Sequence, residues 1–182
     1  MYEKDCDVRN YVAYVDGSYE HSKRMYAFAC IIIDPSNNIE AVISETGDES
    51  DIISMRNVAG ELKGAIAAMK YANEKGIDSI TIYYDYSGIE KWCTGEWKTK
   101  KPFTTKYKAI YDLISKNVKI SFAKVKAHSG DEFNEMVDKI AKNLISFGDK
   151  KGVNYSEIFD GLGKSILNLE SMSLNEKGDN YE

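Results

Sequence analysis

Four carboxylates stand where apolar segments of the sequence would carry them toward the interior of the protein: Asp16, Glu61, Asp85 and Asp138. Carboxylate oxygens, without cysteine or paired histidine beside them, suit Mg²⁺ or Mn²⁺ and not zinc. Four acids grouped in a partly dry site would repel one another strongly unless cations balanced their charge. The acids therefore predict a site for two divalent ions, Mg²⁺ or alternatively Mn²⁺, with a phosphate group between them.

Two of these acids come at the ends of segments typical of strands. In residues 10–18, alternation puts Val12, Tyr14 and Asp16 on one face, and Gly17 and Ser18 are expected to turn the backbone and leave Asp16 at the lip of a sheet. Taken alone, Asp-Gly-Ser is more often an ordinary turn. Residues 79–85 predict a second strand, which ends in Asp85.

The other two acids fall on predicted helices. From residue 55 the apolar residues recur at helical spacing until Gly76, and Glu61 lies at the inner edge of that stripe. A single glutamate there could also extend its carboxylate to solvent. Residues 132–147 predict a further amphipathic helix, with Asp138 beside its buried stripe and on the same face as Asn134.

The order of the elements predicts an α/β fold. Strands over residues 25–34 and 39–46 should form an antiparallel meander with the first strand. The helix before residues 79–85 makes that connection a crossover, so the strand should run parallel to a neighbour and bring Asp85 to the same sheet edge as Asp16. Helical segments follow within 87–97 and 103–116, and the last strand is expected over 118–125.

Length and composition favour one core with an appended tail. The chain has 182 residues, of which 43% are hydrophobic. We expect a catalytic domain over residues 1–150 and an extension over 151–182, consisting of a short helix followed by a disordered end. No apolar run is long enough to span a membrane, and the start lacks the order of a signal peptide. Three widely spaced cysteines, Cys6, Cys30 and Cys93, fit reduced thiols and a cytoplasmic protein.

Charge is distributed unevenly along the chain. The net charge is −5, yet residues 86–126 contain ten lysines and three acids, which gives that segment +7 and leaves −12 for the remainder. Such a run is often only a solvated face, but here tryptophan, phenylalanine and tyrosine alternate with the lysines. Flat rings among positive charges are typical of surfaces that bind a phosphate backbone.

The sequence around the four acids resembles the type 1 ribonucleases H over residues 8–147. The motifs that carry the resemblance are Tyr14-Val15-Asp16-Gly17-Ser18, Arg56-Asn57-Val58-Ala59-Gly60-Glu61-Leu62, Ile82-Tyr83-Tyr84-Asp85, and Val125-Lys126-Ala127-His128-Ser129-Gly130 followed by Asn134-Glu135 and Asp138. The resemblance implies a five-stranded mixed sheet of order 3-2-1-4-5 flanked by helices. It also implies hydrolysis of the RNA strand of RNA/DNA hybrids, with 5′-phosphate and 3′-hydroxyl products.

The resemblance also implies roles for individual residues. The four acids would hold the two metal ions, His128 would assist proton movement and product release, and Asn57 would contact bases in the minor groove. Further contacts with the hybrid are expected from Gly17, Ser18, Arg56, Trp92, Lys98, Lys100, Lys101 and Asn134. An RNA/DNA hybrid is the expected partner, with no membrane and no obligatory protein partner, and the protein is expected to be a monomer.

The chain departs from the pattern of that family in three places. Residues 19–24 replace a glycine-rich turn, Tyr86 follows Asp85 where serine is usual, and the segment 85–97 is shorter than in members with a full basic protrusion. We therefore expect the grip on the DNA strand to be weaker or to move to the lysines of 98–108. The N-terminal module that binds hybrids in many bacterial relatives is also expected to be absent. Two alternatives remain, a DNA-cutting nuclease or transposase of the same fold and a non-catalytic binding module.

Overall fold

The computed structural model describes residues 10–126 and 129–147. The expectations for Cys6, for His128 and for the tail lie outside these residues. The elements, in chain order, are β1 (Asn10–Glu20), β2 (Met25–Ile33), β3 (Ile39–Gly47), the 3-10 helix η1 (Ile53–Met55), α1 (Asn57–Glu74), β4 (Ser79–Tyr84), α2 (Gly88–Thr94), α3 (Pro102–Ile114), β5 (Lys119–Lys124) and α4 (Glu132–Phe147).

The strands form one mixed sheet in the order β3-β2-β1-β4-β5. β1 and β3 both pair antiparallel with β2, whereas β1 with β4 and β4 with β5 are parallel pairs. The two antiparallel connections are short, and α1 supplies the crossover to β4 that a parallel neighbour requires. The predicted sheet, its strand order and its mixed character are confirmed.

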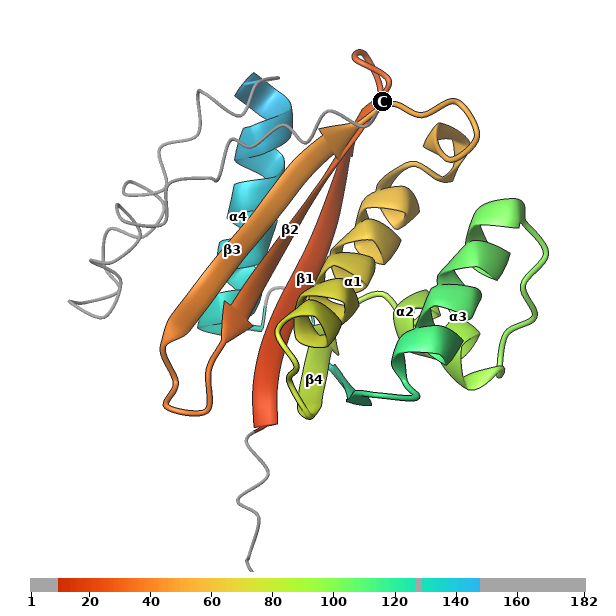
Figure 1. Cartoon of the computed structure of the whole chain (residues 1–182). Helices are drawn as coiled ribbons and strands as arrows, with labels where there is room; N and C mark the ends of the chain where they lie inside the picture. Colours follow the sequence, from red (N-terminus) through yellow and green to blue (C-terminus); the bar gives the residue numbers. More distant parts are fainter. Residues whose placement is uncertain (1–9, 127–128, 148–182) are drawn as a thin grey trace, which may run out of the picture.

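Helices cover the two faces of the sheet unequally (Figure 1). α1, α2 and α3 share one core with the side chains of Ala13 and Val15 on β1. On the other face α4 packs against β1 and β2, and its Val137 and Ile140 form a core with Tyr14. Tyr14 thus faces one core while Ala13 and Val15 face the other, as the alternation in the sequence predicted.

The expected turn at Gly17 and Ser18 is wrong. β1 continues to Glu20, and Ser18 pairs with Ala27 on β2. The pairing of β1 with β4 ends earlier, at Tyr14 opposite Tyr83. Asp16 therefore lies at the place where β1 and β4 separate, rather than at a turn of its own strand.

The helix boundaries differ from the predicted ones by a few residues. α1 begins at Asn57 rather than at Met55, because η1 precedes it and Arg56 adopts a positive φ of 55° between the two. α4 has the predicted boundaries. None of the helices in the described part of the chain combines the length and the apolar character needed to cross a bilayer.

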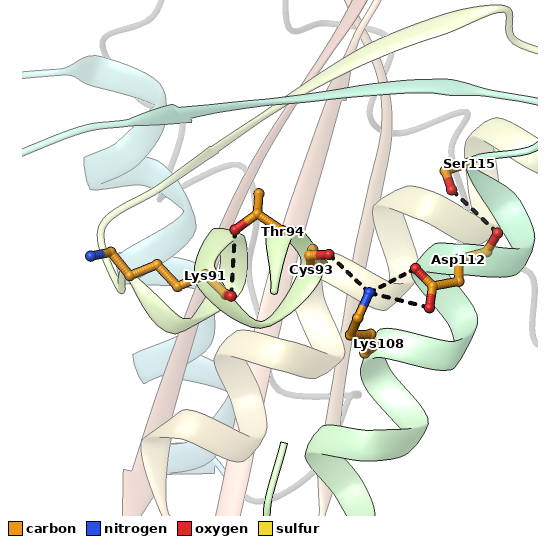
Figure 2. Close-up of polar contacts among 6 residues, drawn as sticks. All are labelled: Lys91, Cys93, Thr94, Lys108, Asp112 and Ser115. Atoms are coloured by element: carbon orange, nitrogen blue, oxygen red, sulfur yellow. Dashed lines mark hydrogen bonds and ion pairs between the residues drawn. The ribbon is translucent and has the colours of Figure 1, made fainter. Parts of the chain in front are cut away.

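Polar contacts join α2 to α3. Lys108 on α3 donates from Nζ to the carbonyl of Cys93 near the end of α2 (3.2 Å) and to the carboxylate of Asp112 (2.9 and 3.2 Å), as Figure 2 shows. The buried Tyr107 hydroxyl donates to the carbonyl of Ile89 at 2.7 Å. These bonds satisfy carbonyls of a short helix and fix it on its neighbour.

Candidate active site

Three of the four predicted acids meet at one point. Asp16, Glu61 and Asp85 each offer a carboxylate oxygen, and these oxygens all lie within 4.8 Å of one another. Asp16 and Glu61 are buried, with 6% and 3% of their surface exposed, and Asp85 is half-buried. Oxygen atoms this close, on acids this far from solvent, are suited to sharing a divalent cation.

The strand register brings two of the acids together. Tyr14 pairs with Tyr83 across the parallel β1–β4 pair, and β4 ends one residue later at Tyr84. Asp16 lies two residues beyond Tyr14 on β1, and Asp85 is the first residue after β4, so both acids lie where the two strands separate. The prediction that both acids share one edge of the sheet is confirmed.

Glu61 comes from α1 and reaches Asp16 through a close backbone contact. A Cβ atom added to Gly17 would lie 2.4 Å from the backbone nitrogen of Glu61 and 2.7 Å from the backbone oxygen of Asn57. Gly17 is therefore needed because α1 crosses β1 closely at this point, and not because the chain turns there.

The electrostatics of the cluster favour a cation. Burial, helped by the charges of Asp85 and Asp138, raises the pKa of Asp16 to about 7, against the hydrogen bond that it shares with Glu61. Burial and the neighbouring Asp16 raise the pKa of Glu61 well above its usual range. Glu61 Oε2 is also buried without a hydrogen-bond partner among the described residues. A divalent ion would relieve both the repulsion and the unpaired oxygen.

Asp138 lies beside this group and not within it. It lines the same cavity of about 280 Å³, whose walls are Asp16, Gly17, Asn57, Glu61, Asp85, Tyr86, Asn134, Glu135 and Asp138. Its Oδ2 accepts a hydrogen bond from Lys142 Nζ at 2.7 Å. The structure thus places Asp138 in the lining of the cavity with its carboxylate paired to a lysine, and its role as a fourth metal ligand stays a prediction.

The amide side chains expected at the site both line this cavity. Asn57 is exposed at the first residue of α1. Asn134 is buried, its backbone nitrogen donates to Asp131 Oδ1 at 3.1 Å, and its side-chain oxygen has no partner among the described residues. Of the other residues expected here, Ser18 is next to Gly17 on β1 and Arg56 is exposed just before α1.

The lysine-rich segment forms a second cavity of about 340 Å³. Its lining is Ser54, Met55, Val58, Tyr86, Trp92, Lys98, Lys100, Lys101 and Thr104. Trp92 and the three lysines, expected from the sequence to contact substrate, are thus brought together. The Thr104 hydroxyl donates to the carbonyl of Lys101 at 2.9 Å and holds the chain where α3 begins. Lysines around an aromatic wall are suited to a phosphate backbone.

Tyr86 belongs to both cavities and was not expected as a site residue. Its ring packs against Trp92 at 6.1 Å and Trp97 at 6.4 Å between centroids. Glu135 is a second residue that the sequence analysis did not assign to the site. Glu135 is next to Asn134 near the start of α4, and this position in the sequence could have predicted that it lines the site.

Comparison with known proteins identifies relatives over most of the chain. The profile of the RNase H family matches residues 9–146. The ribonuclease H of Neorickettsia sennetsu is 31% identical over 146 residues, which are 74% of this chain and 92% of that protein. The ribonuclease H of Acetivibrio thermocellus is 30% identical over 150 residues, or 76% of this chain and 96% of that protein.

Solved structures show the same fold at lower identity. RNase H1 from the halophilic archaeon Halobacterium salinarum superposes with a TM-score of 0.63 at 22% identity, over 76% of this chain and 98% of that one. LC11-RNase H1, solved in complex with an RNA/DNA hybrid, gives a TM-score of 0.62 at 18% identity, over 76% and 98% of the two chains. The match over residues 9–146, together with the buried acids at the shared sheet edge, shows that this chain belongs to the RNase H family.

Proposed function

We propose that this protein is an endonuclease that hydrolyses the RNA strand of RNA/DNA hybrids. The observation that carries the proposal is the coincidence of two features. The RNase H profile covers residues 9–146. Within these residues, Asp16, Glu61 and Asp85 form a cluster of acids beside a lysine-lined cavity. A cluster that binds cations and a surface that binds phosphates are the two parts that phosphodiester hydrolysis needs.

Divalent metal ions are the proposed cofactors, with Mg²⁺ as the first choice and Mn²⁺ as a substitute. Asp16, Glu61 and Asp85 would hold them, and Asp138, which lines the same cavity, would complete the set. The unpaired Glu61 Oε2 and the raised pKa values of Asp16 and Glu61 support this assignment. When bound, two such ions supply an activated water and stabilise the departing 3′ oxygen, which leaves 5′-phosphate and 3′-hydroxyl ends.

The protein's own residues would position the substrate. Asn57 stands exposed at the mouth of the carboxylate cavity, where its amide can reach base edges and 2′-hydroxyl groups of the RNA strand. Gly17 lines the same cavity. His128 would exchange protons near working pH, because the unperturbed pKa of histidine is about 6.5.

The lysine-lined cavity would hold phosphates of the other strand. Lys98, Lys100 and Lys101 are exposed, so they can contact a phosphate backbone without being desolvated first. The wall provided by Trp92 and Tyr86 offers flat surfaces for sugars. Strand choice would then depend on which strand reaches the acids and which reaches the lysines.

Five substrates test the proposal: an RNA/DNA hybrid, double-stranded DNA, double-stranded RNA, single-stranded RNA, and a DNA duplex with one embedded ribonucleotide. Each strand is labelled in turn and incubated with Mg²⁺ or Mn²⁺. We expect internal cuts in the RNA strand of the hybrid alone, with poor cutting at a single ribonucleotide because one 2′-hydroxyl supplies too few positioning contacts. The Asp85→Asn protein, purified identically, controls for a contaminating nuclease.

Other outcomes of this experiment would replace the proposal. Equal cutting of DNA strands would favour a DNA nuclease or transposase. Binding of the hybrid without a cut in either metal would favour a non-catalytic binding module of the same fold.

We also propose that the protein acts as a cytoplasmic monomer. Cys30 and Cys93 are free and buried, as thiols of a protein in a reducing compartment are expected to be. The mass of the purified protein in solution, measured by light scattering at micromolar concentration, should equal that of one chain. A stable dimer would contradict the monomer, and export of the protein from the cell would contradict the compartment.

A further inference from the structure

One side chain joins three of the four elements that place residues in the walls of the carboxylate cavity; the fourth is α1. Tyr14 lies on β1, two residues before Asp16 and on the same face. Its ring stacks on Tyr83 of β4, with 4.8 Å between the ring centroids and 18° between the planes. Its ring also lies 5.4 Å from that of Phe133 on α4. Tyr14 therefore joins its own strand, β1, to both β4 and α4.

The stacked pair belongs to the last residues that β1 and β4 pair with each other. Tyr14 precedes Asp16 by two residues on the same strand face, and Tyr83 precedes Asp85 by two residues, with β4 ending at Tyr84 between them. Only 9% of the Tyr14 surface is exposed. The two rings thus fix the spacing of β1 and β4 at the point where their hydrogen bonding stops.

The hydroxyl of Tyr14 reaches the first turn of α4. It donates to Asp131 Oδ2 at 3.4 Å, a long hydrogen bond. The other oxygen of that carboxylate accepts from the backbone nitrogen of Asn134 at 3.1 Å, and the Asp131 carbonyl accepts from the nitrogen of Glu135 at 2.9 Å. Asp131 therefore caps α4 and links the start of this helix to β1 through Tyr14.

We infer that Tyr14 is a positioning residue for the active site. Through its ring contacts and its bond to Asp131, it sets where the start of α4 lies relative to the strand pair. That placement decides the separation between Asp138 and Asn134 on α4 and the acids Asp16 and Asp85 on the strands. The inference rests on the proposed function, because it treats these groups as the parts that hold metal and substrate.

The chain offers a matched control in Tyr71. This residue is also a tyrosine whose hydroxyl donates to a carboxylate, Glu40 Oε1, at 2.6 Å, and its side chain is partly buried. It joins α1 to β3 and lines neither of the two site cavities. A substitution at Tyr71 removes aromatic packing and a hydroxyl-to-carboxylate hydrogen bond without touching β4 or α4.

The test compares Tyr14→Leu with Tyr71→Leu. For Tyr14→Leu we expect the Mg²⁺ concentration for half-maximal cleavage to rise about 5- to 10-fold and kcat to fall about 10-fold, since small misplacements of reacting groups are costly. The KM for hybrid should change less than about twofold, because the lysine-lined cavity is built by other elements. Tyr71→Leu should lower the melting temperature and leave the Mg²⁺ requirement unchanged.

A direct metal titration gives a readout apart from activity. Mn²⁺ is added to the free protein and the unbound ion is followed by electron paramagnetic resonance. Weaker Mn²⁺ binding by Tyr14→Leu than by Tyr71→Leu is expected. Equal Mn²⁺ binding and equal Mg²⁺ requirement in the two variants would overturn the positioning role.

Two milder variants keep the test decisive if Tyr14→Leu does not fold. Phe133→Ala removes the ring contact that α4 makes with Tyr14, from a half-buried helix position. Tyr14→Phe removes only the bond to Asp131. Phe133→Ala should raise the Mg²⁺ requirement as Tyr14→Leu does, and Tyr14→Phe should raise it less; no change in either variant would overturn the inference. Failure of the wild-type protein to cut the hybrid would instead overturn the proposed function.

Discussion

Gly17 on β1 and Gly60 on α1 meet backbone to backbone. A Cβ atom added to Gly60 would lie 2.9 Å from the Cα of Gly17 and 2.4 Å from the carbonyl oxygen of Ala27. Real side chains do not tolerate such distances, so the backbone would have to shift. This contact sets how near the helix that carries Glu61 comes to the strand that carries Asp16.

The glycine contact predicts that Gly60→Ala impairs both stability and cleavage. We expect a loss of about 1–3 kcal/mol in the free energy of unfolding. Cleavage should fall up to about 100-fold, because Glu61 moves with the helix. Gly64→Ala is the matched control, one turn later on the same helix, where the nearest atom would be a side-chain carbon of Val15 at 3.2 Å. Thermal unfolding and hybrid cleavage measure both effects, and equal behaviour of the two variants would contradict the role of the contact.

Asp85→Asn should remove turnover and keep the fold. A neutral amide cannot balance divalent ions, so we expect kcat to fall at least about 10³-fold while hybrid binding is largely kept. Asp78→Asn is the control, since Asp78 is exposed and immediately precedes β4, whereas Asp85 immediately follows it. Near-normal cleavage by Asp85→Asn in Mg²⁺ would contradict the assignment of Asp85 as a metal ligand.

The raised carboxylate pKa values predict an unusual pH dependence for the metal-free protein. Asp16 has a pKa of about 7 in the folded protein and about 3.9 in an unfolded chain. Between these values the folded protein keeps a proton that the unfolded chain releases, so raising the pH favours unfolding. The contribution is fully present below pH 4 and is lost progressively as the pH rises to about 7.

Thermal unfolding in EDTA measures this effect. From pH 5 to pH 8 the melting temperature should fall, and Asp16→Asn should flatten the decrease and raise the value at pH 8. Mg²⁺ should restore more stability at pH 8 than at pH 6, because a ligand must lose its proton to bind metal. A melting temperature that rises over this range in both the wild type and Asp16→Asn would contradict the assigned pKa shift.

The lysine-lined cavity predicts a specific salt dependence of binding. Changing Lys98, Lys100 and Lys101 together to Ala should weaken hybrid binding. It should also flatten the slope of log K against log[salt] by up to about 2 to 3 units, because each lysine that no longer neutralises a phosphate lowers the slope by about one unit. The control changes Lys75, Lys116 and Lys119, exposed lysines outside that cavity, and removes the same charge. Equal slopes for the two triple variants would mean that only net charge matters.

The domain boundary predicts that the tail is dispensable for catalysis. We propose that residues 1–150 form the catalytic domain and that 151–182 are an extension. Truncation after Lys151 should then leave hybrid cleavage and its Mg²⁺ requirement nearly unchanged. A loss of more than about 5 °C in melting temperature would show that the extension stabilises the domain, since each kcal/mol corresponds to about 2–4 °C at this size.

Local patterns in the sequence were enough to define the elements and the edge at which they meet. Alternation along β1 put Tyr14 and Asp16 on one face, and helical spacing put Glu61 toward the core. The crossover through α1 then required β4 to run parallel to β1, which brought Asp85 beside Asp16. These features depend on local periodicity and chain connection, and both can be recognised in a linear sequence.

The distances between elements, in contrast, follow from packing in three dimensions. Periodicity says which face a residue occupies, but it does not say how closely two faces pack. The sequence therefore misassigned Gly17 to a turn, although its missing side chain serves the approach of α1. Asp138 does line the same cavity as the other acids, as the sequence grouped it, but its ion pair with Lys142 depends on the packing of α4 and could not be read from the sequence. Contacts between residues distant in the chain, such as Tyr14 with Asp131, arise only when helices and sheet pack together.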